Sequence, residues 1–253
     1  MRKKVLITGG GKRIGAALVR AFAEDDWQVC IHVNHSTAEA AELILQLKNP
    51  GLHTVTQCDF NLPEERKIWL KTLEKFDLII ANASCYRLTG ANETETPENR
   101  QRYWQVNYHT VLELIEFQQQ NLPANRPAAA IIMLDCDVLN DDGGIKEFTE
   151  PAPGIDSYLA SRIALAHQLP ALARKYAPAL RINAIAPGPV LPPVNCVTKG
   201  MTVILNKVPM HQPVAVDDIV NTALFLQKNN SITGSIIAVD GGMHLGVENQ
   251  ERL

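Results

Sequence analysis

The stretch that most constrains the fold of this chain is residues 4–15, which read KVLITGGGKRIG. An apolar run enters three glycines, and apolar residues then recur at the helical positions 14, 17, 18, 21 and 22. A strand, a glycine-rich turn and a helix in this order are suited to bind phosphate, because the glycines let the backbone come close and the free N–H groups of the helix N-terminus face the negative charge. A tight turn without a ligand is the alternative interpretation, since many unrelated turns are rich in glycine.

The rest of the chain alternates short apolar runs with longer amphipathic stretches, without repeats. The runs predict six further strands, at residues 29–33, 54–57, 78–81, 128–134, 181–185 and 236–239. The amphipathic stretches predict helices at about residues 36–47, 63–73, 96–120, 157–177 and 217–227, and Ser36 to Glu39 has the pattern of a capping box. This alternation predicts an α/β fold: a single Rossmann-type domain over residues 1–253, with a doubly wound, seven-stranded parallel sheet covered by helices on both faces.

Composition excludes several classes of function. The net charge of −3 gives no electrostatic argument for nucleic acid or an anionic membrane surface, and no apolar run is long enough to span a bilayer. The five cysteines are scattered and form no Cys-x-x-Cys pair, so neither a disulfide framework nor a metal site is expected. We therefore expect a cytoplasmic protein whose partner is a small-molecule substrate.

In parallel sheets of this kind, ligands bind beyond the carboxyl ends of the strands. Six predicted strands end in small or polar residues, at positions 8–9, 32–36, 59, 82–84, 135–137 and 187–188. One polar strand end is ordinary, but six together predict one continuous site.

The end of the second strand bears on the choice of cofactor. NAD enzymes usually carry an acidic residue there, but residues 32–36 read HVNHS and contain none. Lys12 and Arg13 add positive charge nearby, so a 2′-phosphate would be accepted and NADP(H) is favoured over NAD(H). A solvated turn arginine is the alternative interpretation of Arg13.

Tyr158 and Arg162 lie four residues apart in a predicted helix, on the same face. A cation near a phenol favours the phenolate and lowers its pKa, which helps the phenol to exchange a proton. The alternative interpretation is that Tyr158 and Arg162 are ordinary surface residues.

Together these residues resemble the short-chain dehydrogenase/reductase superfamily over nearly the whole chain. Residues 8–15 resemble its cofactor turn, Asp59 falls where the family contacts adenine, and residues 82–84 (Asn-Ala-Ser) resemble its segment after the fourth strand. Asn107 and Tyr158 match the asparagine and tyrosine of the catalytic tetrad, and residues 183–188 and 232–242 are similar to the C-terminal motifs of the family. The resemblance implies an NAD(P)-dependent oxidoreductase that forms a homotetramer or a homodimer.

Within the superfamily the chain is most similar to the pteridine reductases, including dihydromonapterin and dihydrofolate reductases. That branch carries Arg where Arg13 replaces the third glycine, and Asn-Ala-Ser followed by an aromatic residue that packs on the pterin, here Tyr86. Residues 207–210 are also similar to a segment of the branch. A loop aromatic that covers the edge of the core is the alternative interpretation of Tyr86.

Three positions depart from the pattern. Arg162 stands where the family has lysine, and this exchange is not conservative, because arginine is larger, planar and forked. His35 stands where the branch has a phosphate-binding arginine. The residue that assists the tyrosine normally lies 13 positions before it, where this chain has Ile145. The strand end offers Asp135 and its two neighbours instead, which implies an insertion in the following loop.

The hypothesis is an NADPH-dependent reductase of a dihydropterin or dihydrofolate-like substrate. Tyr158 would donate or relay the proton, Arg162 would position the cofactor ribose, Asp135 would bind substrate or relay a proton, and Asn107 would hold a relay water. A carbonyl reductase of the 3-oxoacyl-thioester type, or a dinucleotide-binding regulator impaired by Arg162, is the alternative.

The resemblance also assigns the binding residues. The segment at about residues 189–210 is expected to form a substrate loop, and Tyr86 and Pro189 to contact the substrate. The cofactor-binding residues are expected to be Gly9, Gly11, Lys12, Arg13, Ile14, Asn34, His35, Ser36, Asp59, Phe60, Asn82, Ala83, Ser84, Tyr158, Arg162, Pro187 and Gly188.

Overall fold

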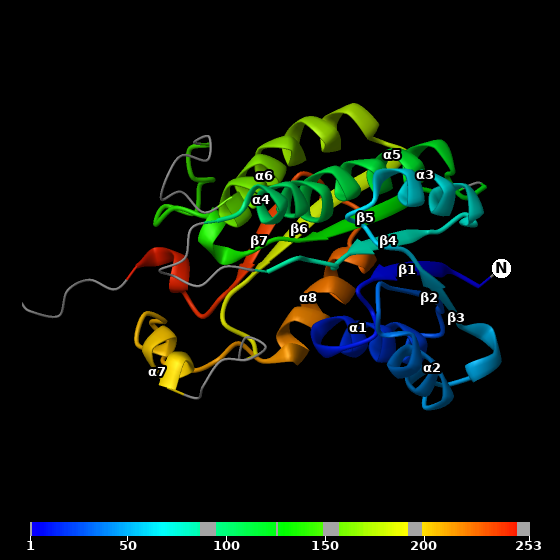
Figure 1. Ribbon diagram of the computed structural model, residues 1–253, viewed down its shortest axis with the longest axis horizontal. Helices are drawn as coiled ribbons and strands as arrows, with labels where there is room; N and C mark the ends of the chain where they lie inside the picture. Colours follow the sequence, from blue (N-terminus) through cyan, green and yellow to red (C-terminus); the bar gives the residue numbers. More distant parts are fainter. Residues whose placement is uncertain (1, 87–94, 125, 149–156, 192–198, 247–253) are drawn as a thin grey trace, which may run out of the picture.

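The computed structural model describes residues 2–86, 95–124, 126–148, 157–191 and 199–246. Its centre is a seven-stranded parallel sheet in the order β3-β2-β1-β4-β5-β6-β7 (Figure 1). The strands are β1 (Lys4–Thr8), β2 (Gln28–Val33), β3 (Thr54–Gln57), β4 (Leu78–Ala81), β5 (Ala128–Met133), β6 (Leu180–Pro187) and β7 (Ile236–Val239). The predicted doubly wound sheet is confirmed, and the predicted strands are correct to within a residue or two at each end.

Helices cover both faces of the sheet (Figure 1). One face carries α1 (Arg13–Glu24), α2 (Thr37–Leu45) and α8 (Val216–Lys228), and the other carries α3 (Pro63–Thr72), α4 (Pro97–Trp104), α5 (Thr110–Gln120) and α6 (Ser157–Tyr176). A short helix, α7 (Lys199–Leu205), lies apart from both layers, beyond the carboxyl ends of the strands. None of the described helices is long and apolar enough to cross a membrane.

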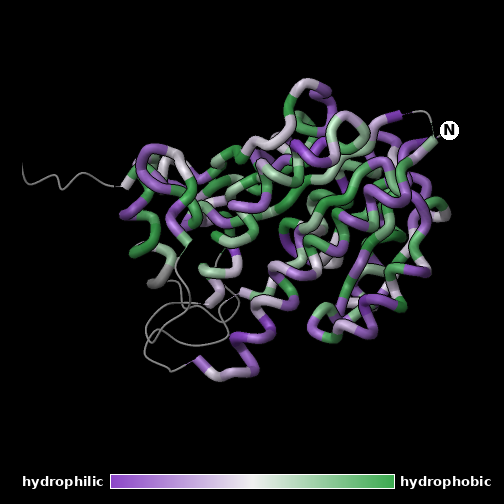
Figure 2. The backbone as a smooth tube through the Cα atoms, turned by 90° about the horizontal axis from the view of Figure 1, so that it is seen from above, coloured by the Kyte–Doolittle hydropathy of each residue, from purple (hydrophilic) through white to green (hydrophobic). Residues whose placement is uncertain are grey.

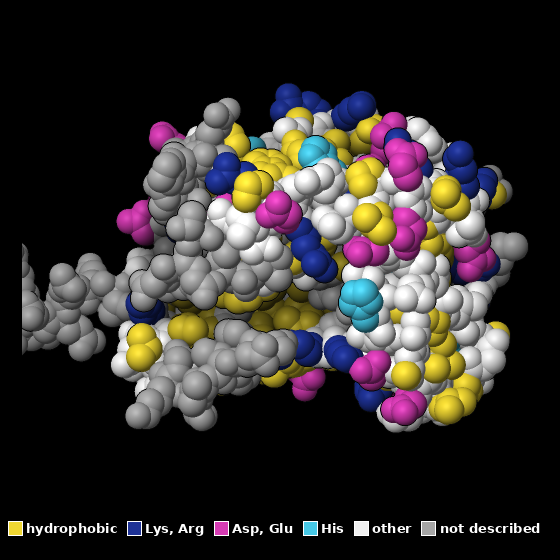
Figure 3. Space-filling view, viewed as in Figure 1, with side chains coloured by type: hydrophobic (Ala, Val, Ile, Leu, Met, Phe, Trp, Pro, Cys, Tyr) yellow, Lys and Arg dark blue, Asp and Glu magenta, His cyan; other side chains and the backbone are white. Residues whose placement is uncertain are grey.

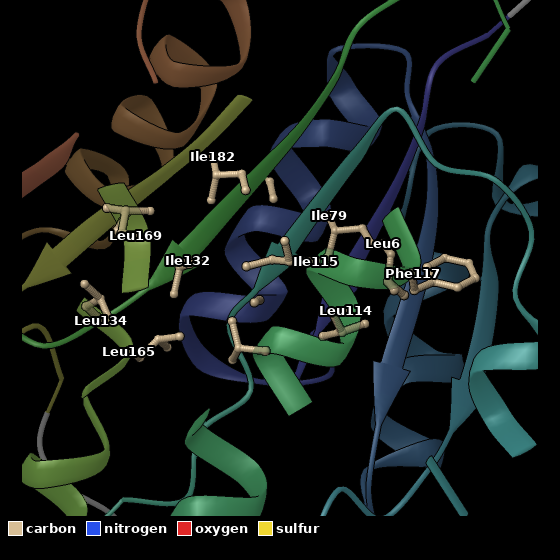
Figure 4. Close-up of a cluster of buried hydrophobic side chains, with 14 of the residues drawn as sticks. Leu6, Ile79, Leu114, Ile115, Phe117, Ile132, Leu134, Leu165, Leu169 and Ile182 are labelled. Carbon is tan, nitrogen blue, oxygen red and sulfur yellow. The ribbon is translucent and has the colours of Figure 1, made fainter. Parts of the chain in front are cut away.

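The core follows from the alternation of side chains along each strand. Leu6 and Ile79 face α5 and α6, whereas their neighbours Ile7 and Ile80 face α1 and α8. Figure 4 shows the first of these two clusters, in which Leu114 and Leu165 meet the strand side chains. In Figure 2 the sheet accordingly forms a hydrophobic centre between helices with hydrophilic outer faces. Strands buried on both faces explain why the runs read as continuously apolar.

The prediction of one long helix at residues 96–120 is wrong in one respect. The structure divides it into α4 and α5, with a π-helical turn between them at Gln105–His109 (η2). The hydroxyl of Thr110 donates a hydrogen bond of 2.8 Å to the carbonyl of Gln105, across this turn. Because π-helical turns frequently occur at functional sites, the position of Asn107 inside η2 is notable.

The expected capping box at the start of α2 does not form. Ser36 is the N-cap residue, but its side chain makes no capping hydrogen bond. Glu39 instead pairs with Lys12 of the glycine turn, at 2.6 Å between Nζ and Oε1. The ammonium group of Lys12 thus takes the place of the Ser36 backbone N–H, which the side chain of Glu39 would bind in a capping box.

The order of the strands determines where a ligand can bind. β1 pairs with β2 on one side and with β4 on the other, so the chain reverses its winding direction at β1. At such a reversal the loops after neighbouring strands diverge and leave a crevice at their carboxyl ends.

Candidate active site

Two adjoining hollows lie at the carboxyl ends of the strands. We call the first the turn pocket; its volume is about 420 Å³, and it is lined by the glycine turn and the ends of β2, β3 and β4. We call the second the cleft; its volume is about 590 Å³, and its lining includes Asp135 and Tyr158. The pockets share Arg13, Ile14, Asn82 and Ser84, so they form one continuous groove. Figure 3 shows a hollow lined by hydrophobic side chains on this face, with basic side chains at its edge.

The structure brings the residues expected from the sequence together in this groove, with one exception. The turn pocket is lined by Gly9, Gly11, Lys12, Arg13, Ile14, Asn34, His35, Ser36, Asp59, Phe60, Asn82, Ala83 and Ser84. The cleft is lined by Tyr86, Asp135, Tyr158, Arg162, Pro187, Gly188 and Pro189, besides the four shared residues. Asn107 lines neither pocket.

The glycine turn is shaped by close contacts of its backbone. Gly9 has a φ of +63°, and a Cβ there would lie 3.0 Å from the Cα of Ala83. A Cβ on Gly15 would lie 2.1 Å from the carbonyl oxygen of Gly9, so only glycine lets α1 start so close to β1. The amide of Asn82 donates to the carbonyl of Thr8 at 2.9 Å and holds the turn from the side of β4.

His32 is a structural residue of this turn. Its Nδ1 accepts from the Gly9 N–H at 3.4 Å, so its Nε2 carries the proton and donates to the carbonyl of Cys58 at 3.1 Å. The ring stacks on Phe60 with 3.9 Å between the centroids. Burial lowers the pKa of His32 to about 4, and the bond to Cys58 opposes this shift only in part. His32 is therefore neutral at pH 7 and supplies no charge for a phosphate.

The backbone conformation of Arg13 fits its position in the glycine turn. Its φ is +54°, in the left-handed region that favours glycine, which agrees with its position at the third glycine of the motif. Its Nη2 donates to the carbonyl of Leu191 at 3.3 Å, so the side chain reaches across the groove toward the segment after β6. Arg13 therefore lies where the turn pocket meets the cleft.

Tyr158 and Asp135 form the polar centre of the cleft. The hydroxyl of Tyr158 donates to Oδ2 of Asp135 at 2.8 Å, and Oδ1 of Asp135 accepts from the N–H of Asp137 at 3.0 Å. Of the three candidates at the end of β5, Asp135 is thus the one in contact with the tyrosine.

The pKa of Tyr158 is raised above its usual value. Burial is the largest cause, and Asp135 raises the pKa further, whereas Arg162 lowers it. The predicted lowering of the pKa by Arg162 is present, but burial and Asp135 outweigh it, so the pKa of the phenol is raised on balance. A phenol that keeps its proton is suited to act as a proton donor.

Arg162 is buried, with 2% of its surface exposed. Its Nη1 donates to the carbonyl of Met133 at 3.3 Å, its Nε has no hydrogen-bond partner, and its Cζ lies 5.7 Å from the centroid of the Tyr158 ring. None of the ion pairs between described residues includes Arg162. A buried cation whose Nε has no partner, and which forms no ion pair with another described residue, indicates that a ligand completes its surroundings.

Aromatic rings flank the reactive phenol. The ring of Tyr86 meets that of Tyr158 edge to face at 5.0 Å, and the buried Tyr103 lies 5.9 Å away on another side. Tyr86 is 49% exposed and lines the cleft, so part of its ring surface is accessible to a planar ligand.

Asn107 acts on the backbone after β4. Its Nδ2 donates to the carbonyl of Cys85 at 3.0 Å, and its Oδ1 accepts from the N–H of Cys85 at 2.9 Å. These bonds fix the segment that leads to Tyr86. The role of holding a relay water stays a prediction.

Several residues of the cleft were not expected from the sequence. They are mostly apolar: Met133, Leu134, Val190, Leu191, Met201, Ile204 and Met243. Lys207 is the polar exception. Apolar side chains do not indicate a binding role in the sequence. Only the predicted substrate loop at residues 189–210 included some of these residues.

One group of described side chains could in principle hold a metal ion. Ligand atoms of Asp135, Cys136 and Asp137 lie within 4.8 Å of one another. However, Asp135 is engaged by Tyr158, and burial raises the pKa of the Cys136 thiol, which disfavours the thiolate that a metal requires. That the site works without a metal stays a prediction.

Comparisons with known proteins agree with this geometry. The family model described as enoyl-(acyl carrier protein) reductase, of the short-chain dehydrogenase/reductase type, matches residues 10–244. A glucose 1-dehydrogenase of Gluconobacter oxydans is 26% identical over 96% of this chain and 92% of its own, and a dihydromonapterin reductase of Enterobacter sp. is 28% identical over 96% and 98%.

A solved structure extends the likeness to three dimensions. The FolM alternative dihydrofolate reductase 1 of Brucella canis, crystallised with NADP, has a TM-score of 0.82 and 28% sequence identity, covering 99% of this chain and 97% of its own. The residues matched by the family model include most of the glycine turn, Asp135, Tyr158 and the C-terminal motif. The chain therefore belongs to the short-chain dehydrogenase/reductase superfamily of oxidoreductases, in the family described as enoyl-(acyl carrier protein) reductase.

Proposed function

We propose that this protein is an NADPH-dependent reductase of a dihydropterin or a dihydrofolate-like substrate. The observation that carries the proposal is the hydrogen bond of 2.8 Å from the Tyr158 hydroxyl to Asp135, beside the half-exposed ring of Tyr86. A protonated phenol, a carboxylate and an aromatic face suit a planar heterocycle that must be bound and protonated. Dihydromonapterin reductases and an alternative dihydrofolate reductase are among the similar proteins.

The residues present fit a dinucleotide phosphate cofactor. A Cβ at Gly11 would lie 3.0 Å from Val33 and 3.1 Å from Ser36, so only glycine lets the backbone of the turn pack this closely against the end of β2 while it lines the turn pocket. The end of β2 carries no carboxylate, and Lys12 and Arg13 lie beside it, as a 2′-phosphate requires. The structures of two similar FolM proteins are complexes with NADP. Under this proposal, Gly9, Gly11 and Arg13 would hold the phosphates, and Arg162 the far end of the cofactor.

NADPH, when bound, supplies the hydride. Tyr158 gives its phenolic proton to the substrate atom that becomes basic as the double bond is reduced. Asp135 accepts the Tyr158 hydrogen bond before the transfer, and its carboxylate stays available to the N–H groups of a pterin ring. Arg162 then limits the negative charge left on the phenol, because its guanidinium lowers the pKa of Tyr158.

The proposal is tested by the oxidation of NADPH with 7,8-dihydrobiopterin, dihydrofolate and a simple ketone as substrates. We expect the two dihydropterins to be reduced, and Tyr158→Phe to lower kcat by about 10²- to 10⁴-fold while the affinity for NADPH is unchanged. Turnover of the ketone alone would indicate a carbonyl reductase, and tight NADPH binding without any turnover would indicate the regulator; either result would contradict the proposal.

Three broader properties belong to the same proposal. The whole chain would act as one domain, in which residues 189–210 form the substrate loop; this is supported by Pro189, Met201 and Lys207, which line the cleft. The protein would act in the cytoplasm, which is supported by four unpaired cysteines among the described residues. It would assemble as a homotetramer or a homodimer, a state that sedimentation velocity measures directly.

A further inference from the structure

A buried arginine on α3 joins three segments that are far apart in the sequence. Arg66 has 1% of its surface exposed. Its Nε and Nη2 donate to the two carboxylate oxygens of Glu113, at 2.9 Å each. Nη2 also donates to the side-chain oxygen of Gln105 at 2.9 Å, and Nη1 donates to the carbonyl of Phe60. A charge removed from water needs partners of this kind, and a planar guanidinium fixes their directions. We call Arg66, Gln105 and Glu113 the clamp.

The clamp holds the chain on both sides of the π-helical turn. Gln105 is the first residue of η2, and Glu113 lies in the first turn of α5, which follows η2. Within the turn, the hydroxyl of Thr110 binds the carbonyl of Gln105. A π-helical turn is rare, and a shift of the helix by one residue would rotate the side chains of η2 by about 100° around the axis. A clamp at both ends opposes such a shift.

Asn107 is the residue of η2 whose direction matters for the site. It is fully buried, and its amide bonds both the N–H and the carbonyl of Cys85, at 2.9 and 3.0 Å. Both bonds require the side chain to point toward the segment after β4. Tyr86 follows Cys85, and its ring lies 5.0 Å from that of Tyr158. A rotation of η2 would therefore release the backbone that carries Tyr86.

The bond from Arg66 to Phe60 leads to the other end of the groove. Phe60 lines the turn pocket, and its ring stacks on His32 at 3.9 Å between the centroids. His32 in turn accepts from the N–H of Gly9. Arg66 thus contacts the cofactor side and the substrate side of the groove through separate hydrogen bonds.

We propose that Arg66 is a positioning residue of the reductase, which holds Tyr86 in place through Gln105 and shapes the turn pocket through Phe60. Arg66 and Gln105 line neither the turn pocket nor the cleft, so both act through other residues. The inference extends the proposed function, on which its kinetic readout rests.

Gln105→Leu separates the substrate side from the cofactor side. The variant keeps the size of the side chain and removes the acceptor, while the bonds of Arg66 to Glu113 and Phe60 remain. We expect the KM for 7,8-dihydrobiopterin to rise by about tenfold or more, and kcat and the Kd of NADPH to change by less than about twofold. Arg66→Met should weaken the binding of both ligands. The variants at Gln105 decide the proposal even if Arg66→Met does not fold.

Two further variants separate positioning from general stability. Gln105→Glu keeps an oxygen that accepts from the guanidinium, so it should retain the wild-type KM. Gln118→Leu is the matched control, because Gln118 is a fully buried residue of α5 whose amide donates to the carbonyl of Phe76 at 2.7 Å, away from the groove. It should leave the KM unchanged, and an equal rise in the KM of Gln118→Leu would overturn the inference.

A double-mutant cycle tests the connection to Tyr86. In protein that already carries Tyr86→Ala, Gln105→Leu should not raise the KM further, because the ring that it displaces is absent. A merely structural role of Gln105 would raise the KM equally in both backgrounds, which would overturn the inference.

Hydrogen exchange gives a readout that does not depend on turnover. Without ligands, the N–H of Cys85 should exchange at least about tenfold faster in Gln105→Leu than in the wild type or in Gln118→Leu. Equal exchange in the three proteins would overturn the inference while the reductase function stands. If the wild type reduces no dihydropterin, the proposed function fails, and the exchange at Cys85 still decides the inference.

Discussion

The hydroxyl of Tyr158 and the carboxylate of Asp135 lie 2.8 Å apart, and the tyrosine is the donor. Burial and this carboxylate together raise the pKa of the phenol, against the effect of Arg162. The pair therefore holds a proton in the cleft instead of releasing it, which is the state needed to protonate a substrate during reduction.

Replacing Asp135 changes the pH dependence of the reaction. Because the carboxylate raises the pKa of Tyr158, Asp135→Asn lowers it. The reaction needs the protonated phenol, so we expect kcat of Asp135→Asn to begin its decline at a lower pH than kcat of the wild type. The measurement is kcat against pH at saturating substrate. Glu147→Gln, at an exposed residue, is the control and should keep the wild-type profile; an Asp135→Asn profile equal to it would contradict the account.

Arg162 is expected to affect stability and activity in opposite directions. Its buried guanidinium donates to the carbonyl of Met133, and its Nε has no hydrogen-bond partner. Arg162→Met keeps much of the volume and removes the buried charge, so we expect the free energy of unfolding to rise by about 1–4 kcal/mol and kcat to fall by about 10²-fold.

Urea unfolding measures the predicted rise in the free energy of unfolding of Arg162→Met, and Arg66→Met is the matched control. Arg66 is equally buried but bonds Glu113 and Gln105 at 2.9 Å, so its loss should destabilise the fold. If Arg162→Met were destabilising to the same degree, Arg162 would be an ordinary structural residue.

Arg13 combines a backbone cost with a role in binding. Since its φ is +54°, Arg13→Gly should relieve about 1 kcal/mol of backbone strain while it weakens NADPH binding by about tenfold or more relative to NADH. Arg13→Ala removes the same side chain without relieving the strain. The two variants should bind NADPH equally weakly, with Arg13→Gly the more stable in thermal unfolding. Equal affinities of the wild type for NADH and NADPH would refute the assigned role of Arg13.

His32 makes the stability depend on pH. In the unfolded chain His32 takes up a proton near its ordinary pKa of 6.5, but in the fold only near pH 4. The unfolded state therefore binds more protons between these values, and the free energy of unfolding falls by at most about 3 kcal/mol as the pH drops from 6.5 to 4. The difference in unfolding free energy between the wild type and His32→Asn, followed over this range, isolates the effect from the carboxylates. A difference that does not change with pH would show that His32 is not the responsible group.

Most of the fold could be predicted from the sequence because a buried parallel strand must be apolar on both faces, as residues 78–81 illustrate. The glycine turn could also be predicted from the sequence, since Gly9 and Gly15 occupy positions that exclude a Cβ. The π-helical turn at Gln105–His109 could not be predicted, because one wider turn does not change the apolar spacing of a helix.

The parts of the site that the sequence missed depend on contacts between distant residues. Glu39 has the spacing of a capping box, but its partner is Lys12, which the fold brings beside α2. The loop between Asp135 and Tyr158 could be predicted only to carry an insertion, because the bridge from Leu139 to Ile145 and the hydrogen bond from His167 to Lys146 decide the form of its described part. The pKa of Tyr158 likewise depends on burial, which cannot be inferred from the four-residue spacing between Tyr158 and Arg162 in the sequence.

The most direct test of the central claim follows the hydride itself. The enzyme is supplied with NADPH deuterated at C4 of the nicotinamide and with a 7,8-dihydropterin, and the pterin product is analysed by mass spectrometry. We predict a tetrahydropterin that carries one deuterium from the wild type, and almost none from Tyr158→Phe in the same time. Oxidation of NADPH without deuterium in the pterin, or an unchanged yield from Tyr158→Phe, would contradict the account.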